Sequence, residues 1–374
     1  MNHASMAPRA LFPLLLTASL PLSGCATAVG TAPDADAAVD APDDQPSVRC
    51  PVSPASPLAI AATRPLGRLD QPARVVGRLG SSIETHLGPR WIFAEVGLTP
   101  ARGDARTRVN ASMAAPVHAS PTALQEPLDA TDAPEEALVP RSAEMSAPGG
   151  DPLALWPTAI GVPQGATTAV FYSRWRLHGG FLNFSPEGVG VARFTADGVP
   201  LTREPTLLYG AGERAYLPVA RQGDDVYLLS CTVVGQFDAE CRMARAASAD
   251  VARRTSYRYW DGATWTADAG RAAVMARGMN GFSLAYNRHL ARWVAVYGEI
   301  LGNRVFVRTA PAPEGPYGAA TLAFEAPRPA VNNIYGVAQN PALSDPEGCA
   351  LRVSWYNPLG EASGEMRVTE VTLR

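Results

Sequence analysis

Hydrophobic and polar positions alternate in short runs along this chain rather than in helical periods. Seven runs of four to six residues are rich in β-branched and aromatic side chains, which is typical of strands. They are Trp91–Ala94, Thr168–Tyr172, Val189–Phe194, Val226–Cys231, Trp293–Tyr297, Val305–Arg308 and Leu351–Trp355. Turn signals such as Asp197-Gly198 and Asp261-Gly262 separate them. Only Ser248–Arg254 has a short helical pattern, so the sequence predicts an all-β fold.

The predicted strands recur in modules that begin near Tyr216, Phe282 and Ile334. Their spacing of roughly 50–65 residues lies at or above the upper end of the usual propeller repeat, and five or six such modules fit into residues 50–374. Radial repetition buries many small sheets while it exposes only short edges. We therefore expect a β-propeller over residues 50–374. A segment rich in Ala, Pro, Ser and Asp predicts a long irregular insertion at about 99–151.

A different pattern precedes this domain. Ala10–Leu22 is an apolar run of 13 residues that follows Arg9. A membrane-spanning helix needs about 20 apolar residues, so this run has the length of a secretory signal instead. The next residues, Leu22-Ser23-Gly24-Cys25, resemble the lipobox of bacterial lipoproteins. The resemblance implies that residues 1–24 are a signal peptide and that Cys25 carries lipid. An ordinary secretory cleavage site with an incidental Cys25 is the alternative.

Residues 25–49 contain almost no large apolar side chain, and they carry five acids but only one basic residue, Arg49. The acids are Asp34, Asp36, Asp40, Asp43 and Asp44. Such a segment predicts a disordered, self-repelling tether. By resemblance to known lipoproteins, Ala26 after the cysteine favours the outer membrane, so the expected partner of the chain is a lipid bilayer.

The charges of the chain exclude two classes of function. The chain has a formal net charge of −3, and the tether acids exceed this imbalance, so the domain itself is close to neutral. A near-neutral domain without a basic stripe argues against nucleic-acid binding. All 32 basic residues are arginine, which removes lysine nucleophiles and Schiff bases from the candidate mechanisms.

Four cysteines remain once Cys25 is assigned to lipid, and an even set in an exported chain predicts disulfides. Three pairings are open. We favour Cys231–Cys241, which would staple a local hairpin, and Cys50–Cys349, which would join the two ends of the domain. No pair has the spacing of a zinc or redox motif, and the histidines are scattered. We therefore expect neither a metal site nor a cofactor.

Several short motifs follow one another within residues 207–357. They are Cys241–Ala246, Tyr257–Trp265, Phe282–Asn287, Val307–Ala310, Pro313–Tyr317 and Ile334–Gly336. In their order and spacing they resemble the bacterial domain-of-unknown-function family 4185. The resemblance implies a five-bladed β-propeller similar in shape to arabinanase-type glycosidases. It places Glu95 where the first blade of that family has an aspartate, and Asn340-Pro341 where the family often has His-Pro.

Candidate site residues follow from the expectation that a propeller binds ligands at the mouth of its central channel. Glycoside cleavage needs two carboxyl groups about 5–9.5 Å apart. Glu95 and Glu299 each end an apolar run that we interpret as an inner strand, and Glu213 is a third candidate acid. Ligand contacts are expected from aromatic and amide side chains, namely Tyr216, Tyr286, Asn287, Tyr335 and Asn340.

The sequence thus predicts an exported, lipid-anchored propeller that binds a carbohydrate or another polar surface ligand, with catalysis not established. One alternative is an arabinanase-like glycoside hydrolase that uses paired carboxylates. A second alternative is a protein-interaction propeller, which would show a broad apolar patch on its rim.

Overall fold

The computed structural model describes residues 58–374 apart from 118–119, 146–150, 179–182, 197, 235–237, 280, 330, 332 and 361–362. The predicted signal peptide, Cys25, the tether and Cys50 lie outside the described residues. No helix within the described ranges is long and apolar enough to cross a membrane. The longest α-helix there is α1, Ser142–Met145.

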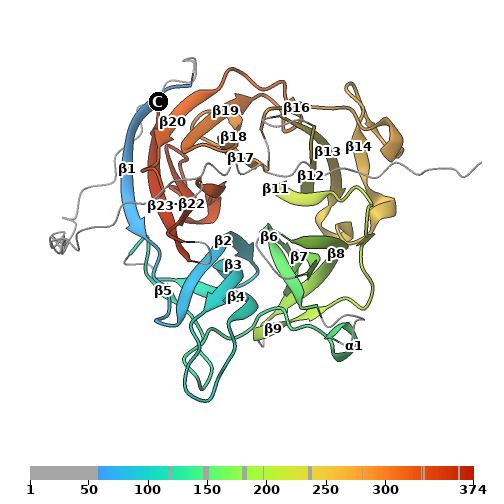
Figure 1. The fold of residues 1–374 in the computed structure, drawn as a ribbon. Helices are drawn as coiled ribbons and strands as arrows, with labels where there is room; N and C mark the ends of the chain where they lie inside the picture. The colour runs from blue at the N-terminus through green and yellow to red at the C-terminus, as the bar shows by residue number, and fades with distance from the viewer. Residues whose placement is uncertain are drawn as a thin grey trace, which may run out of the picture. The chain divides into compact units, whose positions relative to one another are not determined.

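Five antiparallel sheets are arranged in a ring, so the chain forms a five-bladed β-propeller (Figure 1). The first sheet contains β2 (Val75–Thr85), β3 (Gly88–Leu98), β4 (Arg108–Pro116) and β5 (Leu124–Gln125). The second contains β6 (Leu153–Gln164), β7 (Thr167–Leu177), β8 (Phe184–Thr195), β9 (Gly198–Arg203) and β10 (Tyr209–Gly210).

The third sheet contains β11 (Leu217–Gln222), β12 (Asp225–Val233), β13 (Ala239–Ala247), β14 (Arg258–Trp260), β15 (Trp265–Thr266) and β16 (Ala276–Arg277). The fourth contains β17 (Ser283–Asn287), β18 (Arg292–Gly298), β19 (Arg304–Ala310) and β20 (Thr321–Glu325). The fifth contains β21 (Tyr335–Gln339), β22 (Ala350–Pro358), β23 (Gly364–Leu373) and β1 (Ile60–Arg68). Short 3-10 turns cover Ser248–Asp250, Arg254–Ser256, Ala269–Arg271 and Pro341–Leu343.

The ring is closed by pairing of the first described strand with the last. β1 runs antiparallel to β23, with Ile60 opposite Leu373 and Arg68 opposite Arg367 (Figure 1). Strands from opposite ends of the domain therefore complete one sheet. Each sheet has one strand closest to the centre of the ring, which we call the hub. These inner strands are β2, β6, β11, β17 and β21, and each contacts the next one around the ring.

The hydrophobic core is divided into five clusters, and each cluster lies between two neighbouring sheets. Ile92 and Leu155 belong to the cluster between the first two sheets, and Val294 and Val353 to the one between the last two. The cluster around Trp91 and Tyr356 joins the first sheet to the fifth. Flat sheets that bury both faces against neighbours explain the apolar runs of the sequence, because strands inside such a blade have no solvated face.

The expected strands are found, but their places in the blades differ from the sequence interpretation. Trp91–Ala94 and Trp293–Tyr297 lie in β3 and β18, which are the second strands of their sheets, not the inner ones. A second strand has a partner on each edge and a sheet on each face, so it is more apolar than the inner strand that borders the hub.

The region 99–151 also contains regular structure. It supplies β4, the third strand of the first sheet, together with β5 and α1. The Ala- and Ser-rich sequence of β4 has little β-propensity, but pairing with β3 and burial of the strand compensate for this.

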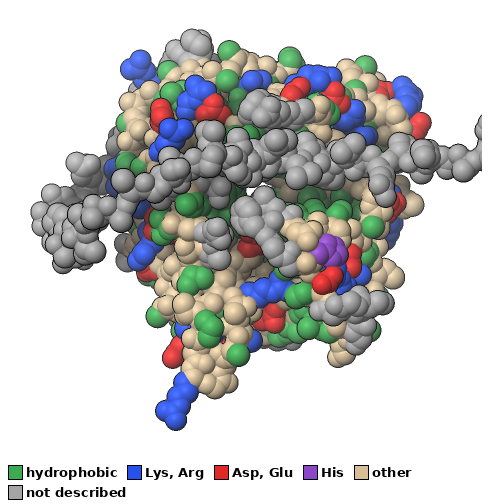
Figure 2. Space-filling model, in the orientation of Figure 1, with side chains coloured by type: hydrophobic (Ala, Val, Ile, Leu, Met, Phe, Trp, Pro, Cys, Tyr) green, Lys and Arg blue, Asp and Glu red, His purple; other side chains and the backbone are tan. Residues whose placement is uncertain are grey.

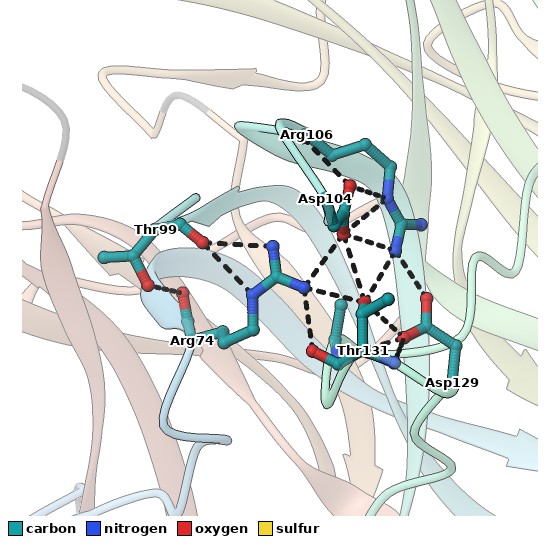
Figure 3. A network of polar contacts seen from close by, with 7 residues as sticks. Arg74, Thr99, Asp104, Arg106, Asp129 and Thr131 are labelled. Atoms are coloured by element: carbon teal, nitrogen blue, oxygen red, sulfur yellow. Dashed lines mark hydrogen bonds and ion pairs between the residues drawn. The ribbon is translucent and has the colours of Figure 1, made fainter. Parts of the chain in front are cut away.

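A polar network holds this region to the first sheet (Figure 3). The Arg74 guanidinium donates to the Thr99 carbonyl, to Asp104 and to Thr131, and Arg106 joins Asp104 to Asp129. Hydrogen bonds from Arg106 and Arg74 hold the pKa of Asp104 well below its usual range. The network adds to the apolar packing of this region, in which Ala133 and Leu138 are fully buried.

The predicted Cys231–Cys241 disulfide is confirmed. The two residues face each other in the β12–β13 pair, and their sulfur atoms are 2.01 Å apart. The Cys50–Cys349 pairing stays a prediction because Cys50 lies outside the described residues.

Candidate functional site

A cavity of about 860 Å³ lies at the hub, and the inner strands of all five sheets line it. Two glycines let the strands around this cavity pack closely against their neighbours. A Cβ atom on Gly80 would lie 2.4 Å from the Phe93 ring, and one on Gly161 would lie 2.7 Å from the Glu84 carbonyl oxygen. Ala220, Ala285 and Ala338 continue the small lining on the other three inner strands. The residues that line the cavity thus come from segments far apart in the sequence.

The charged side chains that line the cavity lie at one of its open ends, which we call the charged mouth. Each inner strand is the first strand of its blade, so the carboxyl ends of the inner strands gather at the same end of the hub. Glu84 lies near the end of β2 and Arg221 near the end of β11, while Arg288 follows β17. All three line the cavity.

Glu84 and Arg221 form an ion pair 2.8 Å long across this mouth. It connects the first sheet to the third, which are not neighbours in the ring. The Glu84 side chain keeps 54% of its exposure and the Arg221 side chain 30%, so solvent screens the pair. Glu84 is the one carboxylate among the described residues that line the cavity.

Tyr286 supplies an aromatic surface at the same mouth. Its side chain lines the cavity and remains 40% exposed. The ring packs edge-on against Trp293, with 5.8 Å between ring centroids, which fixes its orientation. This aromatic side chain therefore remains accessible to a ligand.

The other predicted ligand-binding residues lie elsewhere. Tyr335 is 44% exposed and packs against Tyr356, while Tyr216 is buried against Tyr259 between the second and third sheets. Asn287 is buried and donates to the Gly348 carbonyl. These residues do not lie together at one site.

Asn340 holds two neighbouring sheets together. Its side-chain oxygen accepts from the Ser82 amide at 2.8 Å, and its amide nitrogen donates to Ser354 and to the Ala338 carbonyl. The residue is fully buried. Its amide thus joins the first and fifth sheets at the hub.

Glu95 has an unusual backbone and an unusual carboxyl environment. It lies in a bulge of β3 opposite Gly77 and Leu79, with φ of 52°, a conformation that a non-glycine residue adopts only under strain. Water reaches its side chain, but the surrounding protein desolvates the carboxyl and raises its pKa. Burial, together with the nearby Tyr356 and Glu95, raises the pKa of Tyr335.

Glu299 and Glu213 are both held by arginine. Arg304 hydrogen-bonds both oxygens of Glu299 and lowers its pKa. Glu213 accepts from the Gly210 amide and from Arg254, which lower its pKa in that order of effect. Glu213 precedes β11 and Glu299 follows β18, so both lie toward the end of the hub where inner strands begin. The charged cavity mouth lies at the other end.

The sequence interpretation missed Glu84, Arg221 and Arg288. All three lie at or just beyond the carboxyl end of a short inner strand, and no local motif marks them. In three of the five blades a charged residue lies close to the first hairpin turn, and this becomes visible only when the blade boundaries are known. No group of three His, Cys, Asp or Glu residues in the described ranges is arranged to hold a metal ion.

The fold and the hub cavity define a five-bladed β-propeller with a central cavity. Residues 197–359 match the sequence profile of a family described as a domain of unknown function, DUF4185. This match coincides closely with the stretch of motifs recognised in the sequence. No curated protein matches the chain.

Solved structures share the architecture. A Bacteroides ovatus protein provisionally described as a hydrolase has a TM-score of 0.50 and 14% identity, over 82% of this chain and 87% of that one. A GH43_1 enzyme from Xanthomonas citri has a TM-score of 0.47 and 13% identity, over 83% and 90% of the two chains. An exo-β-1,3-galactanase from Phanerochaete chrysosporium has a TM-score of 0.47 and 13% identity, over 84% and 64%. The likeness to the Bacteroides ovatus structure, at 14% identity, shows a shared fold and nothing further.

Proposed function

We propose that this protein binds a carbohydrate, or another hydroxyl-rich surface ligand, in the hub cavity and does not cleave it. The observation that carries the proposal is the composition of the cavity mouth. An exposed tyrosine shares a space of about 860 Å³ with amide and charged side chains. Ligand pockets of about 300–1,000 Å³ that combine an apolar surface with a few polar groups are typical of small-molecule sites.

The chemistry of a sugar ring fits this lining. A pyranose presents an apolar C–H face that packs on an aromatic ring, and a rim of hydroxyl groups that need hydrogen-bond partners. Tyr286 offers the aromatic face. Gln222 lines the same cavity and brings an amide group to it, whereas the Thr85 and Ser283 hydroxyls donate to the Gly88 and Val296 carbonyls.

Hydrolysis is less well supported at this cavity because it needs two carboxyl groups with different pKa values on either side of the scissile bond. The described lining contains a single carboxylate, Glu84, and Arg221 neutralises it. A binding site tolerates such a pair, whereas a catalytic acid needs a proton to donate.

One observation favours the glycosidase alternative at the opposite mouth. The protein around Glu95 desolvates its carboxyl and raises its pKa, which is what a catalytic acid requires. Incubation of the protein with xylan, arabinan and galactan oligosaccharides tests this alternative. Product release that disappears in Glu95→Gln would establish hydrolysis and overturn the binding-only proposal.

Binding is tested with a glycan array and the purified domain, followed by titration calorimetry of each hit. Tyr286→Ala should weaken binding by about two- to twelvefold, since about 0.5–1.5 kcal/mol of aromatic contact is lost. Tyr335→Ala is the matched control, because Tyr335 has similar exposure but does not line the cavity. Equal losses in both variants would contradict a site at this mouth.

We also propose that the domain is tethered to a bacterial envelope membrane by lipid on Cys25. The support is the apolar run that ends in Leu22-Ser23-Gly24-Cys25. Cys25→Ala should release the protein from the membrane fraction, and continued membrane association of this variant would contradict the anchor.

A further inference from the structure

Arg288 lies at the charged mouth of the hub, and its guanidinium has no hydrogen bond or ion pair with any described residue. It sits in the turn between β17 and β18 and is exposed. It lines the hub cavity and also a smaller neighbouring cavity of about 300 Å³. Many arginines of this protein are instead paired with a carboxylate, as Arg221 is with Glu84. On the face shown in Figure 2, basic and acidic side chains lie next to one another at several places.

The side chains that line the hub cavity carry one excess positive charge. Glu84 is neutralised by Arg221, which leaves the charge of Arg288. Asp345 lines the smaller cavity only, where its carboxylate accepts hydrogen bonds from the Glu347 and Cys349 amides. The lining of the hub cavity itself therefore favours an anion.

We propose that the ligand of the hub is a sugar that carries an anionic group, either a carboxylate or a sulfate, and that Arg288 binds this group while the ring packs on Tyr286. The inference rests on the proposed function, since it assumes that the cavity binds a sugar. It adds the class of sugar and the residue that selects it.

The two side chains suit this task together. Tyr286 and Arg288 are two residues apart at the end of the innermost strand of the fourth sheet, and both line the cavity. A guanidinium presents a fork of N–H donors that matches two oxygens of a carboxylate or sulfate, and hydrogen bonds between ions are stronger than neutral ones. Loss of such a pair should weaken binding by about ten- to a hundredfold.

The test is titration calorimetry of the purified domain with three probes, namely trigalacturonate, neutral galactotriose and a sulfated galactose tetrasaccharide. We expect one of the anionic probes to bind at least tenfold more tightly than galactotriose, and the better probe identifies the anion. Arg288→Gln should abolish this preference, so that the anionic probes bind this variant no more tightly than galactotriose does. Arg288→Lys, which keeps the charge but loses the fork, should retain only part of it.

Arg292→Gln is the matched control. Arg292 begins β18 in the same hairpin, is exposed and lines neither cavity, so its removal changes the net charge equally without touching the mouth. Equal effects of the Arg288 and Arg292 variants would overturn the inference. Equal binding of neutral and anionic probes would overturn it too, but would leave the proposed function standing. Failure of all three probes, and of every glycan on the array, would overturn both.

Discussion

Removal of the Glu126 carboxylate should strongly destabilise the domain, because Glu126 is the partner of a buried arginine. The side chain of Arg78 in β2 is 1% exposed and that of Glu126 is 5% exposed, and the two form an ion pair. The Arg78 guanidinium also lies 3.7 Å from the centroid of the Phe93 ring and donates to the Asp70 carbonyl at 2.5 Å. Burial lowers the pKa of Arg78, and the Glu126 charge opposes this effect.

The magnitude follows from the burial of both groups. Loss of one partner from a buried ion pair costs about 3–5 kcal/mol, because the remaining charge is left without compensation in a low dielectric. At about 2.1 cal/mol/K of unfolding entropy per residue, a unit spanning Cys50–Arg374 should lose about 4–7 °C of Tm in Glu126→Gln. Glu126→Gln preserves the side-chain volume, so the loss reports on charge.

Differential scanning calorimetry and urea denaturation measure this loss. The control is Glu370→Gln, whose partner Arg64 lies 2.9 Å away but is 62% exposed, and exposed pairs contribute at most about 1 kcal/mol. A loss in Glu126→Gln no larger than that in Glu370→Gln would refute the reasoning. The double variant Arg78→Met with Glu126→Leu should recover most of the stability, since apolar groups of similar volume can replace a buried pair.

Three further predictions concern stability. Cys231→Ser with Cys241→Ser should lower the free energy of unfolding by about 2–3 kcal/mol in urea titrations, as expected for a loop this short, and an unchanged midpoint would count against the hairpin staple. Burial raises the pKa of Glu144, but hydrogen bonds from Arg203 and Arg141 outweigh it and lower this pKa to about 2. Since the ordinary pKa of a glutamate is about 4.3, the stabilisation that Glu144 contributes is present above that pH and is lost as the pH falls toward 2. Glu144→Gln should therefore make the free energy of unfolding less dependent on pH in this window. An unaltered pH dependence would argue against this role of Glu144. Gly336→Ala should shift the urea midpoint downward, because φ there is 62° and a Cβ would lie 2.1 Å from a leucine of β2; a wild-type midpoint would contradict this clash.

The propeller architecture could be predicted from the sequence because its most apolar strands are easily recognised. Val226–Cys231 and Leu351–Trp355 are rich in β-branched and aromatic residues, and their regular spacing indicates repeated blades. β4 was not accessible, because Ala and Ser have low β-propensity and the strand depends on its neighbours in the folded blade.

The candidate site could be predicted from the sequence only in part. Tyr286 was predicted from its place in a strand motif, and the structure places it in the hub cavity. Glu84, Arg221 and Arg288 were missed, since they come from three blades and the hub brings them together. The interpretation of Trp91–Ala94 as an inner strand drew attention to Glu95, because apolar content reflects burial on both faces rather than closeness to the hub.

A crystal structure of the domain soaked with the tightest-binding oligosaccharide from the array tests the central claim most directly. We expect density for a sugar ring packed on Tyr286 inside the hub, with its polar groups directed toward Arg288. Density on the outer rim of the blades, or at the Glu95 end of the hub with cleaved product, would contradict the account.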